Sequence, residues 1–306
     1  MEIRNPYKRR DVFTCAQEAH ARFGGRVSVY HVLKEKQCYP DGCLYFLWRC
    51  IRKEKGESCI HKYKYIGRNC KGCTYYWEEK VHFQPQCLVD EKTMADLMEQ
   101  IESFESWLQS VRYKRLAIAG KIHTVKPWFE KTQTSQQNRL LFKGYLLILK
   151  TGHIQFDHYA DAIYVRISEA HMRDHAFQSG MKLECHGEVR EDRGRLVIHR
   201  PGQFEITGHG RGMLWSKEKA LAQMKTAALH EEQPEQCLQC PWGILMDVHE
   251  TSSGGEIFFR HLYCLKSIES ADACYVYALH KERIKKKRKK SRGKKMKEDE
   301  INPRSF

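Results

Sequence analysis

Strict alternation of apolar and polar side chains is the feature that most constrains the fold of this chain. Over Met181–Val189, the odd-numbered positions from Leu183 onward are apolar or small, and the even-numbered positions are polar or charged. Alternation with period two is typical of a β-strand that buries one face. A polar turn with Gly194 and a second strand-like segment, Arg195–His199, follow. The pattern predicts a β-hairpin whose second strand bends and then resumes at Gln203–Ile206.

Three further strands are expected before this hairpin. Apolar and polar residues alternate over 116–123, with a glycine on the inward side, and they alternate again over 163–167. Residues 140–150 are apolar at both odd- and even-numbered positions. Between the third and fourth strands, residues 168–180 are polar, have helix-compatible spacing and end at a glycine. The region therefore predicts three strands, a helix and two strands.

This order resembles the oligonucleotide-binding (OB) fold, a small five-stranded barrel with a helix between strands three and four. The resemblance implies a binding surface made of strands two and three and of the loops joining strand one to two and strand four to five. Aromatic and basic residues fall on these expected elements. The predicted nucleic-acid-binding residues are Lys126, Trp128 and Phe129 in the first loop, Tyr145 on strand two, Tyr164 and Arg166 on strand three, and Arg190, Arg193 and Arg195 around the last loop.

Such a surface suits a single strand of DNA or RNA. Bases stack on exposed aromatic rings while Arg and Lys contact phosphates, so binding carries little sequence preference. In the alternative interpretation, Tyr145 and Tyr164 cover the barrel against a neighbouring domain and Trp128 anchors its own loop. Another kind of small β-barrel or sandwich fits the same strand pattern.

The positive charge of the chain is concentrated at its end. Residues 281–297 carry twelve Lys or Arg and one Glu, a net charge of +11 out of +15 for all 306 residues, which leaves +4 for the rest. A lysine-rich run of this kind repels itself and binds phosphates without sequence preference, so we expect a disordered basic tail over 281–306. We expect no membrane span and no signal peptide, and hence a cytoplasmic protein.

Cysteine spacing predicts a first metal site. The thirteen cysteines, an odd number, include two C-x2-C pairs, which fits reduced thiols that bind metal better than disulfides. The N-terminal pair stands in the spacing C-x10-C-x2-C-x13-C, formed by Cys59, Cys70, Cys73 and Cys87. Four thiolates suit a tetrahedral zinc ion, and a [4Fe–4S] cluster is the alternative at this site. No role is assigned to Cys15, Cys38 and Cys43, and Cys50 is expected in a core.

A second metal site is predicted near the C-terminus. A C-x2-C pair precedes a strand–turn–strand pattern and two further cysteines, which together resemble a zinc ribbon. The departure from that family is the second pair, which has nine intervening residues, so His261 or His280 could replace its last member. The predicted ligands are Cys237, Cys240, Cys264 and Cys274.

These observations predict an α+β protein that is mostly β. Length and a hydrophobic content of 41% allow two or three domains with real cores. The expected parts are a Cys-rich module at 1–89, a connector helix at 90–111 capped by Asp90, an OB-like barrel at 112–208, a linker and helix at 209–236, a ribbon-like module at 237–280 and the tail.

We therefore predict a non-catalytic protein that binds single-stranded DNA or RNA through the barrel and the tail, with zinc at two sites. One alternative is a subunit of a larger nucleoprotein assembly whose barrel contacts protein subunits. The other is an iron–sulfur protein or a metal-dependent enzyme. For an enzyme, the sequence offers only His171 and His175 at helical spacing without a third ligand, and no motif that assigns a reaction.

Overall fold

The computed structural model describes residues 1–134, 137–252 and 255–278. More of these residues lie in strands than in helices, which confirms the predicted α+β, mostly β class. None of the helices in the described ranges is both long enough and apolar enough to cross a membrane. The predicted basic tail, 281–306, lies outside the described residues.

The described chain divides into two compact units. The first contains residues 1–119, 151–163 and 186–202, and the second contains residues 120–150, 164–185 and the chain from 203 onward.

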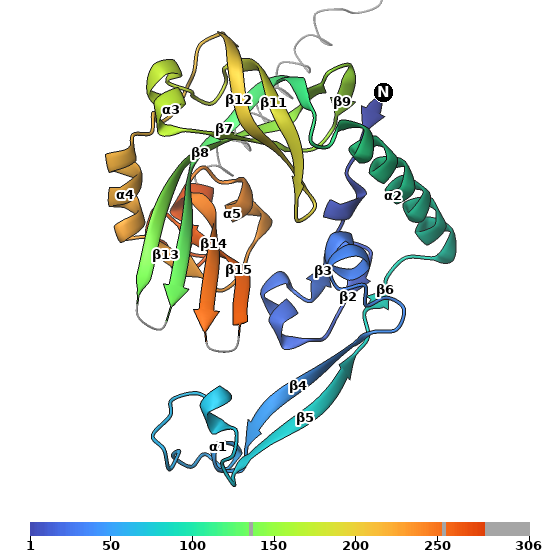
Figure 1. The fold of residues 1–306 in the computed structure, drawn as a ribbon, viewed down its shortest axis with the longest axis vertical. Helices are drawn as coiled ribbons and strands as arrows, with labels where there is room; N and C mark the ends of the chain where they lie inside the picture. Colours follow the sequence, from blue (N-terminus) through green and yellow to red (C-terminus); the bar gives the residue numbers. More distant parts are fainter. Residues whose placement is uncertain (135–136, 253–254, 279–306) are drawn as a thin grey trace, which may run out of the picture. The chain divides into compact units, whose positions relative to one another are not determined.

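Ten strands of the described chain form the main sheet, in the order β1-β9-β8-β10-β12-β11-β7-β14-β15-β13, and β8 also pairs with β7 (Figure 1). Helix α3, Glu169–His175, lies between β10 and β11 as the sequence predicts, but a further strand of three residues, β9, stands between the expected second and third strands. The strands are β1 Glu2–Ile3, β7 Arg115–Thr134, β8 Asn138–Ile154, β9 Asp157–Tyr159, β10 Ile163–Ile167, β11 Lys182–Asp192, β12 Arg195–Thr207, β13 Ala228–His230, β14 Gly243–Ser252 and β15 Gly255–Cys264.

In the first unit, helix α2, Glu91–Val111, begins where the sequence predicts. The Asp90 side chain accepts a hydrogen bond of 2.7 Å from the Thr93 amide and so caps the helix. Trp107 stacks on Tyr159 of β9, with ring centroids 5.7 Å apart. Apolar residues at three- and four-residue spacing thus bury one face of the helix, namely Leu97, Ile101, Phe104, Trp107, Leu108 and Val111.

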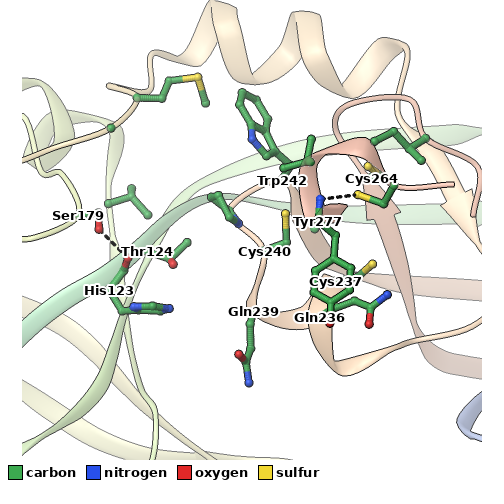
Figure 2. A pocket seen from close by; sticks show the side chains of 18 of the residues that line it. His123, Thr124, Ser179, Gln236, Cys237, Gln239, Cys240, Trp242, Cys264 and Tyr277 are labelled. Carbon is green, nitrogen blue, oxygen red and sulfur yellow. Dashed lines mark hydrogen bonds between the residues drawn. The ribbon is translucent and has the colours of Figure 1, made fainter. Parts of the chain in front are cut away.

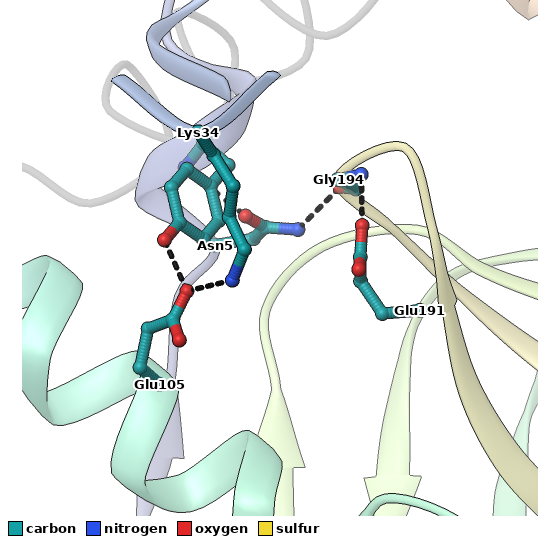
Figure 3. A network of polar contacts seen from close by, with 6 residues as sticks. Asn5, Lys34, Glu105, Glu191 and Gly194 are labelled. Atoms are coloured by element: carbon teal, nitrogen blue, oxygen red, sulfur yellow. Dashed lines mark hydrogen bonds and ion pairs between the residues drawn. The ribbon is translucent and has the colours of Figure 1, made fainter. Parts of the chain in front are cut away.

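A polar network fixes the N-terminal segment in the first unit (Figure 3). Glu105 of α2 accepts hydrogen bonds from Tyr7 and from Lys34. Burial alone would raise the pKa of Glu105, but these two hydrogen bonds outweigh it and hold the pKa below 4.5. The buried Asn5 side chain donates to the Gly194 carbonyl at 2.9 Å, which ties the segment to the β11–β12 turn.

The Cys-rich part of the first unit has two small sheets. Strands β2, Phe13–Thr14, β3, Arg26–Val27, and β6, Gln86–Cys87, form a sheet in the order β3-β2-β6. Strands β4, Cys43–Cys50, and β5, Tyr76–Phe83, form a long separate hairpin (Figure 1). The short helical segments are η1 Pro6–Lys8, η2 Glu18–Phe23, η3 Tyr30–Glu35, α1 Ile51–Glu54 and η4 Arg68–Cys70.

The sequence pattern predicts a helix over residues 11–22 and a strand over residues 26–33, and both predictions are wrong. The strand expected at 26–33 ends after Val27, and η3, a π-helix, begins at Tyr30. Val29 and Val32 are buried three residues apart, a spacing that suits a helical turn better than a strand. The helix expected at 11–22 is replaced by β2 and the short η2, which ends at Gly24 in the left-handed region.

In the second unit, β14 and β15 form the hairpin that the ribbon-like pattern predicts. β14 also lies parallel to the end of β7, from the pair Asp247–Glu130 onward, so this hairpin extends the main sheet. The remaining helices are α4, Lys217–Lys225, and α5, Glu235–Gln239. The helix expected over 216–232 ends at Lys225 because β13 pairs with β15.

Candidate functional site

The four C-terminal cysteines line one cavity of about 750 Å³ in the second unit. Cys237 lies on α5, Cys240 follows that helix, Cys264 ends β15, and Cys274 lies in the segment after it. Figure 2 shows the labelled Cys237, Cys240 and Cys264 around this cavity. The predicted second ligand set is therefore brought together, and it includes Cys274 rather than His261, which does not line the cavity. His280 lies outside the described residues.

The turn after Cys240 has the local geometry of a metal knuckle. The backbone amides of Trp242 and Gly243 donate hydrogen bonds to the Cys240 sulfur. A Cβ atom at Gly243 would lie 2.0 Å from the Cys237 carbonyl oxygen, so only glycine fits this close approach. The Cys274 sulfur likewise accepts a hydrogen bond of 3.4 Å from the Tyr277 amide. Amides aimed at sulfur stabilise a thiolate, the form that binds metal.

Lys126 supplies a buried positive charge beside these thiols. It is 5% exposed, and its Nζ donates to the carbonyl oxygens of Leu238 and Gly243 at 2.6 Å each. Both carbonyls belong to the segment that contains the C-x2-C pair. Lys126 therefore links β7 to the knuckle.

Burial favours the protonated form of two of these thiols. Burial and, to a smaller extent, the neighbouring Cys240, Cys274 and Cys264 raise the pKa of Cys237 to about 11, and burial also raises the pKa of Cys240. Among residues 1–134, 137–252 and 255–278, no three His, Cys, Asp or Glu side chains stand at the distances of a formed metal site. Coordination would require rotation of the side chains and loss of their protons.

The structure separates the first predicted ligand set. β4 and β5 pair from Cys43–Phe83 at one end to Cys50–Tyr76 at the other, a length of about 23 Å. Cys73 precedes Tyr76 at the far end, whereas Cys87 follows Phe83 at the near end, in β6. The prediction that Cys87 completes a site with Cys59, Cys70 and Cys73 is thereby corrected.

Cys50 lies at the same far end of the hairpin as Cys73. It pairs with Tyr76, whose amide donates to the Cys73 carbonyl at 3.0 Å, and Cys73 in turn donates to the Cys70 carbonyl at 3.0 Å. The amides of Tyr63 and His61 donate to the Cys59 sulfur and lower the pKa of that thiol. We call Cys50, Cys59, Cys70 and Cys73 the tip cysteines.

Three of the residues predicted to contact nucleic acid are buried. Lys126, Phe129 and Tyr145 are 5%, 0% and 1% exposed. The segment expected to be the first loop, 126–131, is part of β7. This corrects the prediction for these three residues.

Trp128, Tyr164 and Arg166 remain accessible in the second unit, each of them half-buried. The Arg166 guanidinium lies 4.4 Å from the centroid of the Trp128 ring, and the Lys143 ammonium lies 5.9 Å from it. Tyr164 and Arg166 share the outer row of β10. We call Trp128, Lys143, Tyr164 and Arg166 the outer patch.

The predicted arginines of the last loop belong to the first unit. Arg193 is exposed, and Arg190 and Arg195 are half-buried. Arg190 forms an ion pair of 2.6 Å with Glu188, and its guanidinium lies 5.8 Å from the centroid of the Tyr113 ring. An aromatic ring beside an arginine recurs here, as in the outer patch.

His171 and His175 pack against one aromatic ring. Both rings lie 5.0 Å from the Phe204 ring, centroid to centroid, and pack against it. The pair therefore covers apolar surface within the second unit.

Sequence reasoning missed Lys126 as a partner of the knuckle, Lys143 as a member of the outer patch, and Cys50 as a tip cysteine. Only Cys50 had a signal, since it ends a strand that leads directly to Cys59. Comparison with protein-family models, curated proteins and solved structures finds no match to this chain.

Proposed function

We propose that this protein is a non-catalytic nucleic-acid-binding protein that binds single-stranded DNA or RNA with little sequence preference. The observation that carries the proposal is the pairing order of five strands. β7 pairs with β8, β8 with β10, β10 with β12, β12 with β11, and β11 with β7. This ring of neighbours supports a closed barrel with the strand order of an OB fold.

The outer patch supplies the chemistry of strand binding. In the OB interpretation, β8 and β10 are strands two and three, which bear the binding face. Tyr164 on β10 and Trp128 on the adjoining β7 offer stacking surfaces for bases, and Lys143 on β8 and Arg166 on β10 offer cations for phosphates. Arg166 already covers part of the Trp128 ring, so base stacking requires its guanidinium to move to a phosphate.

Zinc has a structural role in this proposal. The ligands are Cys237, Cys240, Cys264 and Cys274 in the ribbon-like module, and the tip cysteines in the N-terminal module. Closed four-thiolate sites bind zinc without an open position for substrate, so they supply folding energy rather than catalysis. A [4Fe–4S] cluster at the tip is the alternative for that site.

A second candidate function is that of a subunit in a larger nucleoprotein assembly. One face of β4 carries Leu44, Phe46 and Trp48, which are 56%, 58% and 39% exposed. A row of apolar side chains on a projecting hairpin is typical of a protein contact. In this candidate the hairpin contacts another subunit, and the basic tail alone contacts nucleic acid.

The test is a titration of a labelled single-stranded oligonucleotide by fluorescence anisotropy. We expect Trp128→Ala to weaken binding by about 1–3 kcal/mol, the usual loss of one stacked base. Adding Arg166→Gln to this variant should weaken binding further. Trp48→Ala is the matched control, because it removes an exposed tryptophan outside the patch.

A chain that ends at Leu279 separates the two candidates. Residual binding that still depends on Trp128 supports the barrel as the binding domain. Complete loss of binding on truncation, or equal affinity of Trp128→Ala and Trp48→Ala, would refute it in favour of the second candidate.

A further inference from the structure

Four other cysteines gather at the near end of the β4–β5 hairpin, and no role was assigned to three of them from the sequence. They are Cys15, Cys38, Cys43 and Cys87, which we call the base cysteines. All four belong to the first unit.

Strand register places Cys15 and Cys87 on one face of the small sheet. Cys87 of β6 pairs directly with Phe13 of β2, so the two side chains project to the same side. Cys15 lies two residues after Phe13, and its amide donates to the Gly25 carbonyl at 2.9 Å, which continues the ladder toward β3. Residues two apart in a strand share a face, so Cys15 and Cys87 are diagonal neighbours.

Cys38 and Cys43 reach the same face from the turn that precedes β4. The Tyr39 ring lies 5.2 Å from the Phe13 ring, centroid to centroid, which places this turn over the Phe13 side of the sheet. The Gly42 amide donates to the Cys38 carbonyl at 2.6 Å and closes the turn. As a result, the Cys38 and Cys43 side chains hydrogen-bond to each other. Burial raises the pKa of Cys38, and the nearby Cys43 and Cys15 raise it further.

The N-terminal module around the base cysteines has few other interactions to stabilise it. Its strands β2, β3 and β6 are two residues long, and its helical segments η1, η2 and η3 have at most six residues. Cys15 and Cys38 are buried at 6% exposure, and the nearby apolar core is small, namely Val12, Phe13, Val27, Val29 and Val32. Modules with so little core depend on a cross-link or a metal.

We propose that Cys15, Cys38, Cys43 and Cys87 bind one zinc ion as four thiolates. Soft sulfur ligands in a tetrahedral set of four select zinc. The Cys43 and Cys87 thiols now donate to the carbonyl oxygens of Phe83 and Val89, at 3.6 and 3.4 Å. On binding, the four thiols release their protons to solvent, these two hydrogen bonds break, and four zinc–sulfur bonds form.

Together with the tip cysteines and the ribbon-like set, this site accounts for every cysteine of the thirteen except Cys185. Cys185 is 2% exposed within β11 and packs as a core residue. The chain would then bind three zinc ions where the sequence predicts two. The inference does not depend on nucleic-acid binding.

The test is zinc and iron content per chain in the full-length protein, purified under reducing conditions. We expect about three zinc for the wild type, about two for Cys43→Ser and for Cys59→Ser, and about one for the double variant. Cys185→Ala is the matched control and keeps the wild-type content. Wild-type zinc content in Cys43→Ser, or iron in place of zinc at the base, would overturn the proposal.

Thiol alkylation followed by mass spectrometry keeps the proposal testable if Cys43→Ser does not fold. In Cys59→Ser, we expect the four base cysteines to resist alkylation and to become reactive together when a chelator is added. If Cys87 reacts independently of the other three, or if the cysteines stay protected after the chelator is added, they do not share one ion.

Discussion

The buried Lys126 gives the sharpest test of how β7 holds the C-terminal module. Replacement by methionine keeps the volume and the apolar stem but removes both hydrogen bonds to the Leu238 and Gly243 carbonyls. A hydrogen bond from a charged donor contributes about 1.5–3 kcal/mol, so the loss of two in Lys126→Met should lower the free energy of unfolding of the second unit by about 3–6 kcal/mol. In the variant, the two carbonyl oxygens are left buried without a hydrogen-bond donor. Removing the charge of Lys126 therefore does not remove the free-energy cost of the substitution.

The assay is thermal and denaturant unfolding of the full chain, with the rate of zinc release to a chromogenic chelator measured alongside. A loss of this size lowers the melting temperature on the order of 10 °C. Zinc should also leave faster, because four thiolates around one zinc ion carry a net negative charge that the ammonium offsets. Lys121→Met is the matched control, since Lys121 is an exposed residue of the same strand. If both variants unfold alike, the two hydrogen bonds do not stabilise the module and the reasoning is wrong.

Two further predictions concern Glu105 and Gly243. The pKa of Glu105 is held below 4.5, so its contribution to stability is present above that pH and is lost as the pH falls through the lowered value. On acidification below pH 4.5, the melting temperature of Glu105→Gln should therefore change less than that of the wild type. The exposed Glu102→Gln is the control and should behave like the wild type. Gly243→Ala should lose about one zinc per chain, because its Cβ would meet the Cys237 carbonyl, whereas Gly67→Ala, with open space around it, should keep the wild-type content.

The sequence was most informative where one periodicity dominates. The alternation at 181–189, the helical stripe from Asp90 and the hairpin before Cys264 were all predicted close to their final bounds, because each has one buried face. The N-terminal segment misled because Val27 and Val29 have the spacing of a strand, whereas Val29 and Val32 have that of a helical turn. The pairing of β1 with β9 had no local signal, since residues 2–3 meet residues 158–159 only through the fold.

For the candidate sites too, the features that depend on residues close in sequence were predictable, and those that depend on distant residues were not. The grouping of the four ribbon-like cysteines around one cavity was predictable because a C-x2-C pair, a hairpin and two later thiols are close in sequence. Cys87 was misassigned because spacing does not show at which end of a hairpin a residue lies. Lys126 was misassigned because a lysine in a basic, aromatic segment looks like a phosphate contact until its burial is known. Burial of a charge is decided by neighbours from distant parts of the chain, here residues 238 and 243.

The β4–β5 hairpin shows why thiol groups at both of its ends would matter. No residue of either strand is buried, so the hydrophobic effect does little to fix their register. An isolated two-stranded hairpin is marginally stable in water, and this one also exposes an apolar row. A zinc ion at the tip would join Cys50 to the loop before β5, and a second at the base would join Cys43 to β2 and β6. Two such ions would fix both ends of the ladder, and the apolar row of β4 would stay exposed rather than collapse into a core.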